Sequence, residues 1–380
     1  MNPALFIGLM SGTSLDGLDA VLVEFEPSGR PEFLRVEAHV HQGFASELVQ
    51  ELLLLNASGS DELHRAALAS NALARVGATV IRTLLAQTGR LAGDICCVGA
   101  HGQTVRHRPG EFDSTGYTIQ LNNPALLAEL TDIDVVADLR SRDVAAGGQG
   151  APLVPAFHRA AFWRNGEELA VMNIGGISNL TAVRADGDTL GFDCGPGNML
   201  MDDWCRRHTG EPFDRDGRWG DSGQVIEPLL EVLMSEPYFR LPPPKSTGRD
   251  LFNRPWFESR LASLAGERPH PEDVQATLCE LTARSCSLAA LKHAPHACEL
   301  LICGGGAANL ALMNRLAQNM GEVQVFSTSS RGLPHDQVEA CAFAWLAQAF
   351  KKHLPGNIST VTGARGARVL GALYPAGINL

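Results

Sequence analysis

The sequence lacks the patterns that mark zinc-binding and disulfide-linked proteins. None of its nine cysteines forms a CxxC pair, and no cluster of cysteine and histidine has the spacing of a zinc site. The cysteine count is odd, and the adjacent Cys96 and Cys97 cannot easily bridge to each other. The twelve histidines show no HExxH or similar spacing. We therefore expect reduced, mostly buried thiols, as in a cytoplasmic protein, and no histidine-bound metal.

Long apolar runs and an excess of basic charge are also missing. No apolar run approaches the roughly 18–20 residues that span a bilayer. Residues 1–14 have neither the basic nor the apolar region of an export signal. The formal net charge of −11 argues against nucleic acid as the main partner. We expect a cytoplasmic protein that binds neither membranes nor nucleic acid.

The chain does contain enough apolar material for more than one core. Hydrophobic residues make up 45% and charged residues 19%, which is typical of a globular protein and excludes a disordered one. At 380 residues, and at roughly 150 residues per domain, we expect two domains or two lobes of one unit. The 39 glycines follow no fixed period, which excludes collagen and predicts many tight turns and backbone-lined sites.

The hydrophobic pattern predicts a duplicated series of strands. Apolar runs at 4–10 and 18–25 flank a Gly/Ser/Thr turn and predict a hairpin, with a third strand at 32–40. The same order of strand, glycine turn, strand and strand recurs at 168–174, 179–183 and 189–193. Two such series in one chain indicate a duplicated α/β architecture, although the two halves share little sequence.

Helical spacing of apolar residues separates these strands. It predicts helices at 46–55, 61–88, 124–129, 153–163, 224–235, 271–292, 309–318 and 337–351. A loop rich in glycine and charge, at 138–150, predicts the boundary of the first lobe.

Three glycine turns follow or join predicted strands, at 11–14, 173–179 and 303–309. A single turn of this kind can simply close a hairpin. Three of them, with Ser, Thr or Asn beside the glycines, suit a phosphate chain, because glycine lets backbone N–H groups approach an anion. The third also opens a predicted helix, whose N-terminus favours anions. Neither a Walker A loop nor the spaced glycines of a Rossmann fingerprint occur.

Asp193 is the candidate catalytic residue. It ends a predicted strand and is followed by Cys194 and the rigid turn Gly195-Pro-Gly197. A carboxylate at a strand end can cap the next helix. Beside a phosphate loop it can instead act as a general base that takes a proton from a nucleophile.

A further polar set follows strands of the first lobe: His101, Thr104, Arg140, Arg142 and Asp143. Side chains at such loop positions usually meet solvent. The two arginines could equally form a fork for a carboxylate or a phosphate.

Taken together, these motifs resemble those of one enzyme family. The segments GLMSGTSLDGLD at 8–19, HGQTVRH at 101–107, DLRSRD at 138–143, NIGGISNLT at 173–181, FDCGPGN at 192–198, KSTGRD at 245–250 and CGGGAAN at 303–309 occur in that order. The chain closely resembles the bacterial anhydro-N-acetylmuramic acid kinases of cell-wall recycling, over about residues 5–375.

The resemblance implies the fold of the sugar kinase, chaperone ATPase and actin superfamily. That fold is a duplicated, ribonuclease H-like pair of α/β lobes around a nucleotide cleft. We expect a first lobe at 1–137, joined by the returning segment 337–380, and a second lobe at 138–336. The superfamily usually has an aspartate just before its first glycine turn, and this chain has none there. The carboxylate that faces the metal is then expected from Asp16 or Asp19.

The resemblance also implies the reaction and its cofactors, ATP and Mg²⁺. Water opens the 1,6-anhydro ring of 1,6-anhydro-N-acetylmuramic acid at C1, and O6 takes the γ-phosphoryl group. Asp193 is the expected base for both halves, although Cys194 stands where many members have threonine. The resemblance further implies a homodimer whose ligands are small molecules.

The resemblance assigns the remaining site residues by position. It implies that the sugar binds at Thr104, Arg140 and Glu339, with Arg140 on the lactyl carboxylate, and that Asp16 faces the metal of Mg-ATP. The residues implied for ATP are Gly12, Thr13, Ser14, Leu15, Asp16, Gly17, Leu18, Asp19, Gly175, Gly176, Gly304, Gly305, Gly306 and Asn309.

Two other functions are compatible with part of this pattern. One is an ordinary hexose or amino-sugar kinase, in which the same aspartate deprotonates a sugar hydroxyl with no ring opening. The other is a nucleotide-switched binding module. It is disfavoured, because no peptide-binding β domain follows the last lobe and no helix-turn-helix precedes the first.

Overall fold

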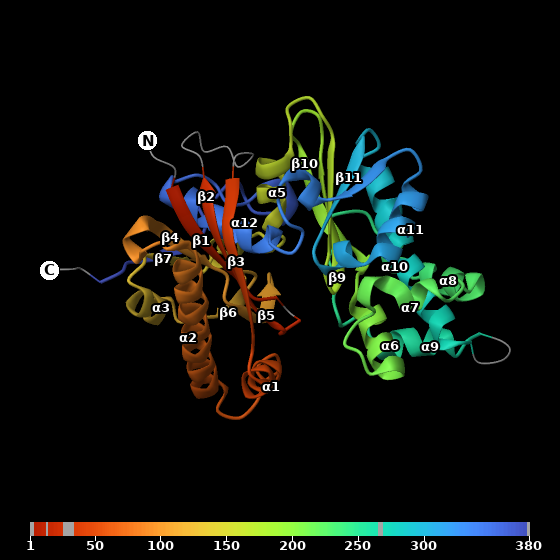
Figure 1. Ribbon diagram of the computed structural model, residues 1–380, viewed down its shortest axis with the longest axis horizontal. Helices are drawn as coiled ribbons and strands as arrows, with labels where there is room; N and C mark the ends of the chain where they lie inside the picture. The colour runs from red at the N-terminus through yellow and green to blue at the C-terminus, as the bar shows by residue number, and fades with distance from the viewer. Residues whose placement is uncertain (1–3, 13, 26–33, 265–268, 378–380) are drawn as a thin grey trace. The chain divides into compact units, whose positions relative to one another are not determined.

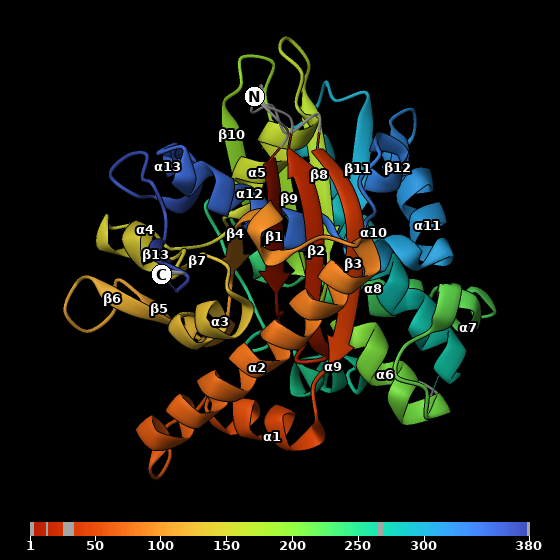
Figure 2. The same ribbon diagram turned by 60° about the vertical axis from the view of Figure 1, so that its left-hand side comes forward.

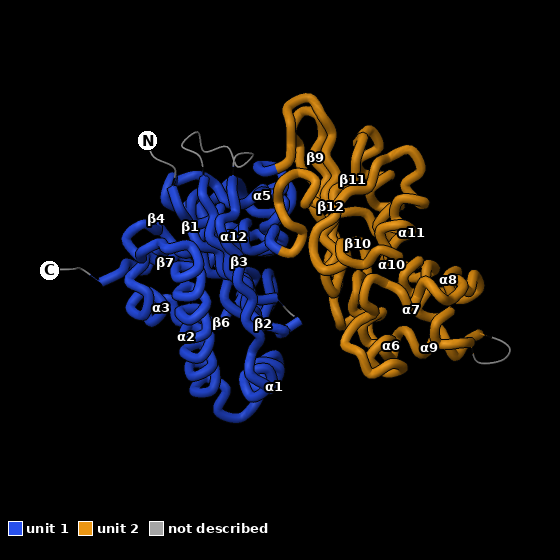
Figure 3. Tube along the Cα trace, viewed as in Figure 1, with its two compact units in different colours: residues 1–161, 337–380 blue, residues 162–336 orange. Residues whose placement is uncertain are grey.

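The computed structural model describes residues 4–12, 14–25, 34–264 and 269–377. They form two compact units, coloured separately in Figure 3. Unit 1 comprises residues 1–161 and 337–380, and unit 2 comprises residues 162–336. Each unit is built around one mixed β-sheet covered by helices, as the ribbon in Figure 1 shows.

The sheet of unit 1 has the strand order β13-β7-β4-β1-β2-β3. Strands β1, β2 and β3 are antiparallel neighbours, so the predicted hairpin and third strand are confirmed. Strand β1 also pairs in parallel with β4, and β4 with β7. The strands are β1 (Ala4–Met10), β2 (Gly17–Phe25), β3 (Leu34–Gly43), β4 (Ile95–Ala100), β7 (Val135–Ala137) and β13 (Ala372–Tyr374).

Two long helices, α2 (Glu62–Thr88) and α12 (Val338–Lys351), lie on opposite sides of this sheet in Figures 1 and 2. Because side chains alternate along a strand, Ile7 packs into the core that α2 covers while Gly8 faces α12. A Cβ at Gly8 or Gly99 would overlap a backbone carbonyl of α12. Glycine at these two positions therefore lets α12 approach the sheet closely.

The rest of unit 1 consists of shorter elements. The hairpin of β5 (Gln103–Pro109) and β6 (Gly116–Leu121) forms a separate two-stranded sheet. The remaining helices are α1 (Ser46–Leu54), η2 (Ala92–Asp94), α3 (Pro124–Thr131), α4 (Ser141–Ala145), α5 (Val154–Phe162) and α13 (Ser359–Thr362), with the end of α5 passing into unit 2.

The sheet of unit 2 repeats the plan of unit 1. Its order is β10-β9-β8-β11-β12, with β8, β9 and β10 antiparallel and with β11 parallel to both β8 and β12. Unit 1 has the same order and directions in β3-β2-β1-β4-β7, so the expected duplicated α/β fold is confirmed. The strands are β8 (Leu169–Ile174), β9 (Ile177–Val183), β10 (Thr189–Pro196), β11 (Glu299–Cys303) and β12 (Gln324–Ser327).

Helix α10 (Pro271–His293) is the central helix of unit 2, and its apolar side chains share one core with β8, β9 and β10. The other helices are α6 (Met199–Thr209), η3 (Arg215–Gly217), α7 (Arg218–Asp221), α8 (Glu227–Met234), η4 (Pro237–Arg240), α9 (Arg254–Leu261), η5 (Gly305–Ala308), α11 (Leu310–Met320) and η6 (Thr328–Arg331). None of the helices in the described part of the chain is both long and apolar enough to cross a membrane.

At two places within residues 101–150 the structure has regular elements where the sequence predicts loops. The predicted loop after β4 contains the start of β5, where Thr104 pairs with Gln120 of β6. The predicted loop at 138–150 contains α4, which lies within compact unit 1. The physical reason is that this segment is bonded to the returning C-terminal part of the chain. For example, the N–H of Gln149 donates to the carbonyl of Thr362 at 2.7 Å.

Candidate active site

The first glycine turn joins β1 to β2 in unit 1. Ser11 donates its hydroxyl to Oε1 of Gln103, and Nε2 of Gln103 donates to the carbonyl of Gly12 at 3.1 Å. The N–H of Leu15 donates to the same carbonyl, and Leu15 has a positive φ of 60°. Leu15 and Leu18 are buried, so only their backbone groups could meet a ligand. Of the predicted turn residues, Thr13 lies outside the described residues.

Two carboxylates follow this turn and have different partners. Asp16 is exposed and accepts a hydrogen bond from Ser14 Oγ at 2.7 Å. Asp19, on β2, shares its Oδ1 between His39 Nε2 at 2.9 Å and His41 Nδ1 at 3.1 Å. Within the described ranges, no group of three or more His, Cys, Asp or Glu is placed to hold a metal ion. Asp16 is therefore the carboxylate of the turn that is open to a solvated cation.

Among the predicted sugar residues, Arg140 has a guanidinium group that is fixed by two partners, Gly150 and His101. Its Nη1 donates to the carbonyl of Gly150 at 2.7 Å, and its Nε and Nη2 lie 3.1 and 2.9 Å from Nε2 of His101. The other ring nitrogen of His101 lies 3.2 Å from the carbonyl of Ser11, and Phe343 packs against the ring. This pattern requires the neutral tautomer with its proton on Nδ1. Burial and the charge of Arg140 both lower the pKa of His101, which favours that neutral form.

Glu339 is an electrostatic partner of Arg140. Burial lowers the pKa of Arg140 to about 10, while the charges of Glu339 and then Asp143 act to raise it. Burial raises the pKa of Glu339, an effect that the charge of Arg140 opposes and that of Asp19 reinforces. Two of the three predicted sugar residues are therefore close enough to interact electrostatically, and Glu339 also interacts with the carboxylate of Asp19. Thr104 lies on β5, where its hydroxyl accepts a hydrogen bond from Gln120 at 3.1 Å.

Asp143 fixes the backbone that carries Arg140. It is fully buried, and its carboxylate accepts hydrogen bonds from Gly150 N at 2.7 Å, Asn357 Nδ2 at 2.6 Å and Thr362 Oγ1 at 2.8 Å. Gly150 in turn accepts from Arg140. Arg142, by contrast, is exposed. Of the two arginines that could bind a carboxylate or phosphate together, only Arg140 is therefore held in place by buried groups.

Asp193 occupies a bulge within β10, not the end of the strand as the sequence predicts, because β10 continues through Pro196. Its Oδ2 accepts a hydrogen bond from Thr247 N at 3.0 Å, and its N–H donates to the carbonyl of Lys245 at 3.2 Å. The hydroxyl of Tyr238 donates to the carbonyl of Asp193 at 2.7 Å. Burial raises the pKa of Asp193 to about 6, although the Thr247 N–H and the charge of Lys245 act to lower it.

Three partners of Asp193 have no role in the sequence-based assignment: Tyr238, Lys245 and Thr247. The motif KSTGRD at 245–250 could have identified Lys245 and Thr247. It lies in a loop between two predicted helices, where neither helix formation nor core packing requires these residue types. Asp202, in the first turn of α6, is a second carboxyl in unit 2 with a perturbed pKa. Burial raises it to about 7, against the lowering effect of Arg206 and Arg249.

The other two predicted glycine turns lie next to each other in unit 2. A Cβ at Gly304 would overlap Asn173 Oδ1, and a Cβ at Gly306 would overlap the side chain of Ile174, which immediately precedes Gly175. Gly304 also has a positive φ of 79°.

The backbone after Asp193 joins these turns. The N–H of Asn198 donates to the carbonyl of Gly175 at 2.8 Å, and that of Gly197 to the carbonyl of Gly176 at 2.9 Å. Asn309 caps α11, because its Oδ1 accepts from Leu312 N at 3.0 Å. The glycine segments of unit 2 thus form one cluster of closely packed backbone, although the amide oxygen of Asn309 is occupied by the cap.

Cys194 points away from this cluster into the apolar core of unit 2, and burial raises the pKa of its thiol.

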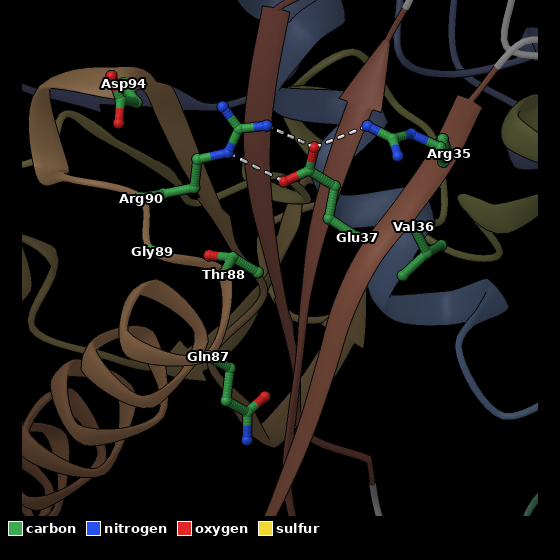
Figure 4. A pocket seen from close by; sticks show the side chains of 8 residues that line it. All are labelled: Arg35, Val36, Glu37, Gln87, Thr88, Gly89, Arg90 and Asp94. Atoms are coloured by element: carbon green, nitrogen blue, oxygen red, sulfur yellow. Dashed lines mark hydrogen bonds and ion pairs between the residues drawn. The ribbon is translucent and has the colours of Figure 1, made fainter.

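A separate cavity of about 520 Å³ lies on unit 1 and contains none of the predicted site residues. Four of its eight lining residues are charged, and they lie on β3, just after α2 and in η2. Figure 4 shows that Glu37 accepts hydrogen bonds from both Arg35 and Arg90, at 2.9 and 2.7 Å. Arg35 also pairs with Glu24 at 2.8 Å, and the charge of Asp94 acts on Arg90, so each arginine has an acidic neighbour besides Glu37.

The chain is similar over nearly its whole length to one group of enzymes. A family model described as "Anhydro-N-acetylmuramic acid kinase" matches residues 4–376. The protein of that name from Variovorax paradoxus (strain S110) is 57% identical, over 99% of this chain and 100% of that protein. The one from Cupriavidus pinatubonensis (strain JMP 134 / LMG 1197) is 55% identical, over 97% and 98% of the two chains.

A solved structure described as the activator of the 2-hydroxyisocaproyl-CoA dehydratase from Clostridium difficile with bound ADPNP overlaps more weakly. Its TM-score is 0.47 at 14% identity, over 93% of this chain and 99% of that chain. An overlap this low adds nothing to the assignment.

Proposed function

The chain belongs to the anhydro-N-acetylmuramic acid kinase family, and from this we propose that it converts 1,6-anhydro-N-acetylmuramic acid and ATP into N-acetylmuramic acid 6-phosphate and ADP. The reaction recycles peptidoglycan. Water opens the 1,6 bridge at C1, and the released O6 takes the γ-phosphoryl group. The observation that carries this proposal is the carboxylate of Asp193, which is partly buried, held by Thr247 and raised in pKa to about 6.

Asp193 is the general base of the first step. Its pKa of about 6 leaves it ionised at neutral pH yet basic enough to accept a proton. The water gives one proton to Asp193 as its oxygen bonds to C1. The C1–O6 bond breaks, its electron pair remains on O6, and O6 attacks the γ-phosphorus. The bond from that phosphorus to the bridging oxygen of ADP then breaks, and the proton on Asp193 returns to solvent.

The glycine turns are the proposed phosphate-binding groups. Backbone N–H groups of the turn after β1 and of Gly175–Gly176 would hold the phosphates of ATP, and the segment from Gly304 to Asn309 would contact adenosine. The oxygen of an exposed carboxylate suits Mg²⁺, which keeps several waters, so Asp16 fits a cation that arrives with ATP. When bound, Mg²⁺ neutralises charge on the phosphates.

Arg140 and Glu339 are the proposed sugar-binding pair. Arg140 would bind the lactyl carboxylate, and its guanidinium is oriented for this by Gly150 and the neutral ring of His101. Glu339 and Thr104 would bind hydroxyl or amide groups of the sugar. An arginine suits this task because its planar donors match a carboxylate.

The test of this function is sugar-dependent release of ADP, with and without Mg²⁺, from the anhydro sugar and from free N-acetylmuramic acid. We expect turnover of the anhydro sugar that requires Mg²⁺. Phosphorylation of the free sugar alone, with the anhydro sugar inert, would indicate an ordinary amino-sugar kinase instead.

Oxygen labelling separates ring opening from plain phosphorylation. In ¹⁸O-labelled water, the anomeric hydroxyl of early product must carry the label, and the ester oxygen at C6 must not. The label has to be read early, because a free anomeric centre slowly exchanges with solvent. Unlabelled C1 in early product would exclude hydrolytic opening.

We further propose that the protein acts in the bacterial cytoplasm and that it forms a homodimer. Light scattering of the purified protein would test the homodimer. The lobe division at 137/138 also remains a prediction. Limited proteolysis distinguishes it from the boundary of the compact units: cleavage within 138–150 supports the predicted division, and cleavage near residue 162 supports a boundary at the end of α5.

A further inference from the structure

A hydroxyl with no partner lies beside the proposed base. Thr247 follows a proline-rich loop between η4 and α9, and its backbone N–H donates to Asp193 Oδ2 at 3.0 Å. Its own hydroxyl oxygen, Oγ1, is buried and has no hydrogen-bond partner among the described residues. Leaving a buried hydroxyl unpaired is unfavourable, so such a group commonly awaits a ligand or an ordered water.

The loop that carries Thr247 is fixed on β10. The carbonyl of Lys245 accepts from the backbone N–H of Asp193 at 3.2 Å. Lys245 Nζ donates to the carbonyl of Tyr238 at 3.1 Å and lies 4.6 Å from the centre of its ring, while the Tyr238 hydroxyl donates to Asp193. Bonds on both sides of Asp193 therefore hold the loop that carries Thr247 beside the carboxylate.

Only one oxygen of the Asp193 carboxylate has a hydrogen-bond partner among the described residues. Thr247 takes Oδ2 of Asp193, and no described residue bonds to Oδ1. A water molecule that attacks C1 has two O–H groups that each need an acceptor, and a lone pair that must point at the carbon. One acceptor fixes only one proton, so the water can still rotate. Two acceptors fix both protons and direct the lone pair, which is the orientation that lowers the barrier.

We propose that Thr247 is a catalytic residue that binds the attacking water together with Asp193. The inference rests on the proposed function. Oδ1 of Asp193 accepts the proton that is transferred, and Oγ1 of Thr247 accepts a hydrogen bond from the proton that stays. The oxygen of the water then forms its bond to C1 while the C1–O6 bond breaks, and Thr247 itself gains and loses no proton.

The test is the substitution Thr247→Val, which removes the hydroxyl but keeps the shape and the backbone N–H. We expect kcat to fall by about 5- to 150-fold, the range for a buried polar group that loses its hydrogen-bond partner. The KM for the anhydro sugar should change by less than about twofold, since the lost contact is to water and is not a contact to bound sugar. The acid limb of the kcat/KM profile should stay in place, because Asp193 keeps its N–H donor.

Two further variants control this result. Thr247→Ser restores the hydroxyl and should recover most of kcat. Thr328→Val removes another buried, unpartnered hydroxyl of unit 2, at the end of β12, which is the opposite edge of the sheet from β10. At saturating ATP it should leave kcat and the sugar KM unchanged. If Thr247→Val does not fold by circular dichroism, Thr247→Ala removes the hydroxyl without adding an apolar methyl and decides the question.

Three results would overturn the inference. A wild-type kcat in both Thr247→Val and Thr247→Ala would mean that the hydroxyl plays no part in positioning the attacking water. A raised sugar KM with unchanged kcat would place the hydroxyl on the bound sugar. An acid limb that moves in Thr247→Val would show that the substitution acts through Asp193. Absence of sugar-dependent ADP release in the wild type would instead refute the proposed function itself.

Discussion

Replacement of Asp193 by asparagine should make the enzyme inactive and more stable at the same time. Asparagine keeps an oxygen that can accept the Thr247 N–H now bonded at 3.0 Å, so the loop at 245–247 should remain in place. It has no basic carboxylate, and general-base assistance is worth about 10²–10⁴-fold in rate. Because this base serves a coupled reaction, we expect kcat to fall by about 10⁴-fold, with ATP binding nearly unchanged.

The stability effect follows from the pKa of Asp193. Burial raises it from 3.8 to about 6, so the folded state binds the proton more tightly than the unfolded chain does. The free energy of unfolding therefore falls as the pH rises from about 4 to about 6, and it stays lower above that range. At about 1.4 kcal/mol per pKa unit, ionised Asp193 costs up to about 3 kcal/mol at neutral pH. Asparagine carries no charge and avoids this cost.

The assays are steady-state ADP release and urea unfolding of both proteins at pH 4 and pH 7.5. We expect a stability gain for Asp193→Asn at pH 7.5 that vanishes at pH 4. A variant that keeps a tenth of the wild-type kcat would show that Asp193 is not the base. A variant less stable than wild type at pH 7.5 would show that the protein does not disfavour the charge.

The same pKa predicts that kcat/KM of the wild type falls as the pH drops below about 6. Asp202 has to be separated from Asp193 here, because burial raises the pKa of Asp202 to about 7. In Asp202→Asn the acid limb should keep its midpoint near 6. A limb that disappears in this variant would assign the titration to Asp202.

Three more substitutions test the contacts around the site. Lys245→Met should move the acid limb of kcat/KM to higher pH, because the charge of Lys245 lowers the pKa of Asp193; an unmoved limb would contradict that coupling. His101→Phe should raise the sugar KM about tenfold or more, with little effect on the KM for ATP, since Arg140 loses its acceptor. Asp143→Ala should lower the free energy of unfolding by at least about 3 kcal/mol in urea, because three buried donors lose one acceptor; a loss below 1 kcal/mol would mean that water replaces the carboxylate.

The regular parts of the fold were predictable from local pattern. The apolar run at 4–10, the helix at 271–292 and the strand at 168–174 are found within a residue of their expected ends. The spacing of apolar residues predicts these elements correctly because one face of each element, or the whole element, is buried. Helix α9 was missed because its sequence has little apolar periodicity, although Asn253 caps it and Pro255 stands in its first turn.

The candidate site was predictable only where a motif carries its own chemistry. Asp193 and the glycine turns stand out in the sequence, whereas the contacts that tune them join residues far apart in the chain. His101 meets Arg140 across 39 positions, and Asp193 meets Thr247 across 54. Such contacts depend on how strands are ordered in a sheet, and no local pattern encodes that order.

The bonds of Asp143 have a consequence for the order in which the protein becomes functional during synthesis. Arg140 is held through Gly150 by a carboxylate whose other donors, Asn357 and Thr362, follow the whole of unit 2 in the chain. Until Asn357 and Thr362 have been synthesised, Asp143 lacks two of its three donors. The segment that carries Arg140 is then held only by the bond from Gly150 to Asp143. A chain that contains all of unit 2 but ends near residue 350 would therefore lack two of the bonds that hold the segment of Arg140, and we expect it to lose the proposed sugar binding.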